Sequence, residues 1–126
     1  MGVVLDFAPI DALHAEWEQT LACLEQANGR AATAAALSSL IAHIERHFGA
    51  EERWMSESGF GARQCHAREH AQVIEVVRDV MRRFEAGDDG IVVRLAAELP
   101  RWFELHASSM DAALAAHLRQ FSGQPR

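Results

Sequence analysis

The sequence lacks the usual features of a membrane, secreted or nucleic-acid-binding protein. No apolar run approaches the roughly 20 residues that a membrane-spanning helix needs. Residues 1–6 contain neither the basic start nor the cleavage site of a signal peptide, which favours a cytoplasmic location. The formal net charge of -6 argues against nucleic acid or an anionic membrane as the main partner.

Cysteine is scarce, and lysine and tyrosine are absent. Two cysteines, Cys23 and Cys65, do not make a disulfide framework, and both are expected to face away from the interior. Cys65 lies about 100° round a helix from His66, so the two side chains are not expected to share a site. We therefore expect two free thiols in a reducing compartment. All 12 basic residues are arginine, which we attribute to genome composition.

Turns that contain glycine divide the chain into four segments. Asn28-Gly29, residues 58–61 and residues 87–90 each form a predicted helix stop or turn. The stretches between them are rich in Ala, Leu, Glu and Arg, which favour helix. The predicted helices are 10–28, 32–57, 62–86 and 91–121. Because the connections are short, neighbouring helices must be antiparallel, so the sequence predicts a single all-α domain over residues 1–126, an up-down-up-down antiparallel four-helix bundle.

Histidines and a carboxylate interrupt the apolar stripes of these helices. In the third segment, His66 and His70 recur with Val73 and Val77 at three- and four-residue steps, which places both histidines on the buried side. Polar groups in an apolar seam are costly unless they are paired or bound to a metal. Six such residues are predicted to face one interior: His14, His47, Glu51, His66, His70 and His106. The pattern indicates a metal site inside the bundle.

A seventh candidate, Asp111, is out of register on a regular helix. It follows His106 by five residues, which turns the two side chains about 140° apart. The apolar stripe has the same misfit: Met110, Leu114, Leu118 and Phe121 lie about 70° further round a regular helix than Leu95, Leu99 and Trp102 before His106. One extra residue in a π-bulge would bring Asp111 back to the side of His106 and realign this stripe, and such bulges often occur at functional sites. We therefore predict a π-type distortion between His106 and Asp111, which unbroken i to i−4 bonding across residues 104–114 would contradict.

The types of side chain in this set determine how they can serve two ions. If Glu51, Asp111 and one solvent-derived oxygen bridge both ions, each ion has three oxygen ligands. Five histidines then divide three and two, so one ion is six-coordinate and the other keeps an open position for a small molecule such as dioxygen. Imidazole and carboxylate ligands suit iron, manganese or zinc, and the absence of thiolate argues against a structural zinc site.

Four motifs make the chain similar to a known protein family. They are residues 10–14 (IDALH), residues 47–55 (HFGAEERWM), residues 66–70 (HAREH), and residues 102–106 (WFELH) with Asp111. With these motifs in this order and with matching gaps, the chain resembles the hemerythrin family, in particular its single-domain bacterial members. The resemblance extends over essentially the whole chain.

The resemblance implies a non-haem di-iron centre inside the bundle. Two iron ions would be bridged by Glu51, Asp111 and an oxo or hydroxo group. The histidines would divide by motif into a set on the saturated iron and a set on the iron with the open position: His66, His70 and His106, and His14 and His47. The implied activity is reversible binding of dioxygen or another small diatomic ligand, for storage, delivery or scavenging, and not an enzyme reaction.

Apolar residues near the expected open iron have two compatible roles. They can pack the core, and they can wall a dry pocket that protects the bound ligand. These residues are Trp17, Ile44, Phe48, Trp102 and Met110. The chain departs from the family in lacking both tyrosine and the tryptophan common near the start of bacterial members, which concerns the entrance to the site and not its ligands.

Two further histidines lie outside the predicted ligand set. His43, one turn before His47, lies toward the edge of its stripe, and we interpret it as incidental, with contact to a ligand or exposure to solvent as alternatives. His117 is expected to offset the dipole of the fourth helix or to be solvated.

Two other functions are alternatives to oxygen binding. Sensing of oxygen, nitric oxide or redox state would need a separate protein partner, because the sequence contains no signalling domain. Peroxidase or nitric oxide reductase activity would need a proton-delivering group near the open iron, for which His43 is the candidate.

Overall fold

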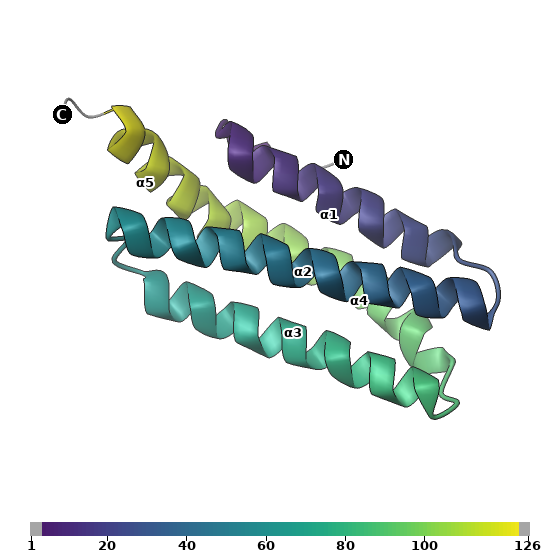
Figure 1. Ribbon diagram of the computed structural model, residues 1–126. Coiled ribbons are helices and arrows are strands. Elements are labelled where there is room, and N and C mark those ends of the chain that lie inside the picture. The colour runs from purple at the N-terminus through teal and green to yellow at the C-terminus, as the bar shows by residue number, and fades with distance from the viewer. Residues whose placement is uncertain (1–3, 124–126) are drawn as a thin grey trace.

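The computed structural model, which describes residues 4–123, contains the predicted helices in the predicted order (Figure 1). They are α1 (Ala8–Gln26), α2 (Arg30–Ser58), α3 (Arg63–Glu85), α4 (Gly90–His106), the π-helical turn η1 (Ala107–Asp111) and α5 (Ala112–Gly123). The last three together replace the fourth predicted helix. No boundary differs from its predicted position by more than two residues. Across residues 4–123 there is no strand, so the all-α prediction is confirmed.

The start of α1 is defined by a proline and an aspartate in its first turn. Pro9 lacks a backbone N–H, which is no loss at a position where that group has no partner within the helix. The Asp11 carboxylate accepts hydrogen bonds from the backbone N–H groups of Leu5, at 2.8 Å, and Phe7, at 3.2 Å. A negative charge is also favourable at this end of the helix dipole. Asp11 therefore fixes how the preceding segment enters the bundle.

The helices form the predicted up-down-up-down bundle. Helix α1 packs against α2, α2 against α3 and α3 against α4, and contacts between α1 and α4 close the ring. In Figure 1, α2 and α3 run side by side, and α4 with η1 and α5 forms the long fourth rod of the bundle. No helix in the described part of the chain is long and apolar enough to cross a membrane.

The core consists of two apolar clusters, one on each side of the buried polar residues. The larger cluster includes Trp17 and Phe48, and the smaller one includes Ile10 and Met55. On α1, His14 lies between Ile10 of the smaller cluster and Trp17 of the larger one. On the antiparallel α2 the order is reversed, with Glu51 between Phe48 of the larger cluster and Met55 of the smaller one. The two clusters therefore exclude water from both ends of the polar layer between them.

The predicted inward stripe of the fourth segment needs two corrections. Phe103, which is 5% exposed, is buried in the core, whereas the predicted Trp102 is only partly buried. Phe121, predicted to continue the stripe, is 37% exposed. Leu114 and Leu118 are buried as predicted, so the π-turn does realign the stripe beyond His106.

Candidate metal centre

A π-helical turn brings Asp111 to the side of His106. The turn spans Ala107–Asp111, which confirms the distortion predicted from the five-residue spacing. His106 Nε2 lies 3.1 Å from Asp111 Oδ1. The hydroxyl groups of Ser108 and Ser109 donate hydrogen bonds to the carbonyl groups of Glu104 and Leu105, where the bonding pattern of the helix changes. These serines therefore supply local donors at the distorted turn.

All seven candidate ligands are buried, none with more than 2% of its surface exposed. Helix α1 supplies one of them, α2 two, α3 two, and α4 with η1 the last two, in the order His14; His47 and Glu51; His66 and His70; His106 and Asp111. This much buried polarity without compensation would be strongly destabilising.

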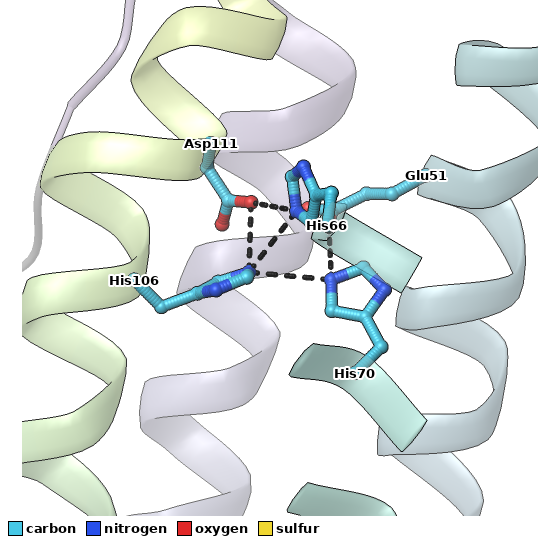
Figure 2. A group of neighbouring side chains, drawn as sticks. All are labelled: Glu51, His66, His70, His106 and Asp111. Carbon is cyan, nitrogen blue, oxygen red and sulfur yellow. Dashed lines mark hydrogen bonds and ion pairs between the residues drawn. The ribbon is translucent and has the colours of Figure 1, made fainter. Parts of the chain in front are cut away.

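Five of these side chains converge on one point. Figure 2 shows them pointing toward one another from α2, α3, α4 and η1. His106 Nε2 lies 3.1 Å from His66 Nε2 and 3.2 Å from His70 Nε2. Two carboxylate oxygens complete the group: Glu51 Oε1 lies 3.2 Å from His70 Nε2, and Asp111 Oδ1 lies 2.9 Å from His66 Nε2. We call these residues the three-histidine group.

A second group uses the same two carboxylates through their other oxygens. His14 Nε2 lies 2.8 Å from Asp111 Oδ2, and His47 Nε2 lies 3.1 Å from Glu51 Oε2. One potential ligand atom from each of these four residues lies within 4.8 Å of the others. We call them the two-histidine group. Glu51 and Asp111 therefore belong to both groups, and the histidines divide three and two as the family resemblance implies.

Hydrogen bonds between neutral imidazoles do not account for the three-histidine group. His70 Nδ1 lies 3.0 Å from Glu52 Oε2, and His106 Nδ1 lies 2.7 Å from Glu69 Oε1. An ionised carboxylate only accepts hydrogen bonds, so each Nδ1 donates, and the Nε2 atom of the neutral ring presents a lone pair. The two lone pairs of His70 and His106 then meet at 3.2 Å and require a positive charge between them, either a proton on one ring or a metal ion.

The distances between donor atoms also fit a metal ion. Ligand atoms about 2.1 Å from an ion and at right angles to one another lie about 3 Å apart. The contacts between potential ligand atoms of the three-histidine group range from 2.9 to 3.5 Å. Glu51 Oε1 and Asp111 Oδ1 are buried, and imidazole nitrogens approach both: His70 Nε2 lies 3.2 Å from the first and His66 Nε2 lies 2.9 Å from the second. The residues present therefore fit two metal ions that share the carboxylates.

Electrostatics points to the same need for positive charge. Burial alone would lower the pKa of His66, but hydrogen bonds with Asp111 and Glu51 raise this pKa to about 9. Burial alone would raise the pKa of Glu51, but hydrogen bonds with His47 and two other imidazoles hold this pKa well below its ordinary range. Without a metal, protons on histidine balance the carboxylates, and a metal ion would replace those protons.

The interpretation of His43 as incidental is wrong. Its side chain is 2% exposed, and its Nε2 atom lies 3.1 Å from His47 Nδ1. Burial, followed by the charges of His47 and Arg46, lowers the pKa of His43 to about 4. Of the alternatives considered, contact with a candidate ligand is therefore the correct one.

His117 also has a specific contact that sequence did not predict. The ring is partly buried, and Nε2 donates a hydrogen bond to the Ser58 carbonyl at 3.0 Å. This contact satisfies a carbonyl group at the C-terminal end of α2, not of its own helix.

The predicted pocket residues are divided between the two groups. Trp17 and Ile44 are fully buried, and the Trp17 ring packs edge-on against the His47 ring, with the centroids 5.7 Å apart. Phe48 stacks on His70 at 3.8 Å, and partly buried Trp102 stacks on His106 at 4.6 Å, so both contact the three-histidine group.

Met110 and Phe103, both from the fourth segment, differ in burial. Met110 is partly buried. Phe103, which was not predicted, packs edge-on against His14 at 4.9 Å and stacks on Trp17 at 4.5 Å. The sequence feature that could have indicated Phe103 is its place next to Trp102, the residue predicted to lie on the inward stripe. Phe103 and Trp17 thus pack against the two-histidine group, and Phe48 also contacts it, edge-on to His47 at 5.6 Å.

Comparison with known proteins agrees with this fold and site, which are those of a cation-binding four-helix bundle. The model of the family described as "Hemerythrin HHE cation binding domain" matches residues 7–118. The chain therefore belongs to the hemerythrin family, as its motifs predicted.

Two relatives illustrate the similarity. The chain is 38% identical over 113 residues to the bacteriohemerythrin of Ralstonia nicotianae, which covers 90% of this chain and 82% of that protein. It is 35% identical over 97 residues to the bacteriohemerythrin of Stenotrophomonas maltophilia, covering 74% of this chain. That match covers 63% of the Stenotrophomonas protein, so less than two thirds of its length is aligned.

Proposed function

We propose that this protein binds dioxygen reversibly at a non-haem di-iron centre. The observation that carries the proposal is the use of both oxygens of Glu51 and of Asp111, one toward each histidine group. Carboxylates placed in this way can bridge two ions. Three histidines on one side and two on the other leave the two ions with unequal numbers of protein ligands.

The unequal division gives the two metal positions different roles. His66, His70 and His106 would complete the coordination of one iron, and His14 and His47 would leave a position open on the other. An iron pair with an open position supplies reversible two-electron binding of dioxygen. Imidazole and carboxylate donors suit iron, manganese or zinc, and we prefer iron because the relatives named above are bacteriohemerythrins.

The surroundings of the two-histidine group favour a carrier over an enzyme. The buried rings of Trp17 and Phe103 pack against this group, which excludes water and limits proton access. His43, the candidate proton donor, directs Nε2 at His47 and not at the space between the groups. Proton-dependent turnover of a ligand is therefore not supported by the side chains on this face.

The proposal is tested by metal analysis together with optical spectra of the anaerobically reduced protein. Two irons per chain are expected, with an absorption band that appears on adding oxygen and disappears on removing it. A His117→Ala variant, altered far from the ligand set, should behave identically. Irreversible bleaching with consumption of peroxide would indicate an enzyme and would overturn the proposal of a carrier. A protein that takes up zinc but no iron would also overturn the proposal.

A further inference from the structure

His43 and His47 form a buried pair of imidazoles on α2. They are one helical turn apart, and His43 Nε2 lies 3.1 Å from His47 Nδ1. The Trp17 ring packs edge-on against both rings, with centroid distances of 6.1 Å to His43 and 5.7 Å to His47. Neither ring has space to turn freely, because both side chains are at most 2% exposed. The contact between the two nitrogens is therefore held by packing on two helices.

The position of one proton on His47 decides whether this residue can bind a cation. A neutral imidazole carries its proton on either Nδ1 or Nε2, and only the unprotonated nitrogen has a lone pair for a metal. Nε2 faces Glu51 Oε2 at 3.1 Å, at the proposed metal position. Binding at Nε2 thus requires the proton to be on Nδ1, and Nδ1 then donates to His43 Nε2.

The outer nitrogen of His43 faces one basic and one acidic side chain. His43 Nδ1 lies 3.4 Å from an Arg46 nitrogen and 3.9 Å from Glu16 Oε1. When Nδ1 is unprotonated, Arg46 can donate to it, and the His47 proton is then on Nε2, facing Glu51. When Nδ1 is protonated, the Glu16 carboxylate favours that proton electrostatically from 3.9 Å, which is beyond hydrogen-bond distance, and the lone pair of His47 Nε2 is available. A metal ion at the two-histidine group would select the second arrangement.

The three-histidine group achieves the same orientation with carboxylates. Glu52 accepts from His70 Nδ1, and Glu69 accepts from His106 Nδ1. Partners of this kind fix the ring orientation and the proton position of a metal-binding histidine. At His47 the corresponding partner is a neutral, buried imidazole, so its orientation depends on a residue outside the four motifs of the family resemblance.

We infer that His43 is a positioning residue that accepts the Nδ1 proton of His47 and thereby directs the His47 Nε2 lone pair at the two-histidine metal position. This inference rests on the proposed metal centre. It does not require His43 to contact a metal ion or the small molecule that binds there.

Two matched substitutions separate hydrogen bonding from packing. His43→Leu removes the acceptor and keeps an apolar side chain in the buried position. In His43→Gln, the amide oxygen lies about as far along the side chain as Nε2 of histidine and can accept the same proton. Thermal unfolding of the metal-free variants reports any loss of packing separately from metal binding.

The measurement is anaerobic titration of the metal-free, full-length protein with ferrous iron. His43→Leu should keep one tight site and bind the second iron about 10- to 100-fold more weakly, and His43→Gln should restore most of that affinity. If glutamine behaves like leucine, the hydrogen bond is not the cause and the inference is wrong. Wild-type affinity for both irons in His43→Leu would also overturn it.

Two further measurements test the proton position on His47 and the metal centre itself. Nitrogen-15 spectra of the protein loaded with diamagnetic Zn²⁺ should show the His47 proton on Nδ1 in the wild type and in His43→Gln. Its presence on Nε2 in either would contradict the inference. His47→Ala tests the underlying centre: loss of one iron supports it, whereas retention of two irons would reject the proposed ligand set itself.

Discussion

Glu51 and Asp111 each direct one carboxylate oxygen at the three-histidine group and the other at the two-histidine group. Both side chains are fully buried, and they come from different helical elements, α2 and η1. Without a positive charge between them they would repel each other, because they share the same small volume. Each carboxylate therefore serves both proposed metal positions, so the loss of either one should affect both.

Removing one bridging carboxylate should prevent assembly of the metal pair. In Glu51→Ala, each position loses an oxygen ligand, and the surrounding imidazoles lose the negative charge that they face. Iron analysis should find fewer than two irons per chain, and the stabilisation of the fold by added metal should largely disappear. Glu45→Ala, on the exposed side of the same helix, is the control and should bind two irons. Two irons in Glu51→Ala would show that this residue does not bridge.

Removing a terminal histidine should instead affect one position. His14 belongs to the two-histidine group, so His14→Ala should retain an iron at the three-histidine group and lose oxygen binding. His66→Ala should instead weaken iron binding at the three-histidine group, because only His70, His106 and the two carboxylates would remain there. Iron content and the oxygen-dependent absorption band distinguish the two variants. Reversible oxygen binding by His14→Ala would require a different division of the histidines.

The π-turn shows what spacing along one helix can predict. His106 and Asp111 share a face only if the helix accommodates one extra residue, and the downstream apolar residues require the same correction. The spacing of His106 and Asp111 and the shift of the apolar stripe therefore predicted the same distortion. The bundle was predictable for a similar reason, since its short turns and apolar stripes limit the possible arrangements.

The position of His43 could not be predicted in the same way. Helical periodicity gives the direction of a side chain relative to its own helix axis, but not how closely a neighbouring helix covers it. His43 is near the edge of its stripe, and Trp17 from α1 closes over it. The partner of His117 is similarly remote, because Ser58 is 59 residues away in sequence. Contacts of this kind between helices can be identified only from the packed structure.

Deleting one residue from the π-turn should leave the bundle intact. In a chain that lacks Ser109, Asp111 follows His106 by four residues, which keeps both on one face of a regular α-helix. Leu114 and Leu118 should stay buried, because the deletion removes the same extra residue that the π-turn accommodates. Circular dichroism should show a fully helical protein without binding of a hydrophobic dye. Deletion of Ala113, within regular α5, is the contrast and should expose part of the apolar stripe.

The stability of the metal-free protein should decrease as the pH rises from about 6.5 to about 9. The carboxylates of Asp111 and Glu51 raise the pKa of His66 from 6.5 to about 9, and the pKa of His106 is also raised. A group with a raised pKa stabilises the folded state fully below its unfolded value, and this contribution is lost as the pH rises through the folded value. Urea unfolding of the metal-free protein should therefore show a lower midpoint at pH 9 than at pH 6.5. Metal binding should become tighter over the same interval, because a metal competes with these protons. His66→Gln should reduce both dependences, and equal midpoints at the two pH values in the wild type would contradict the proton-balanced site.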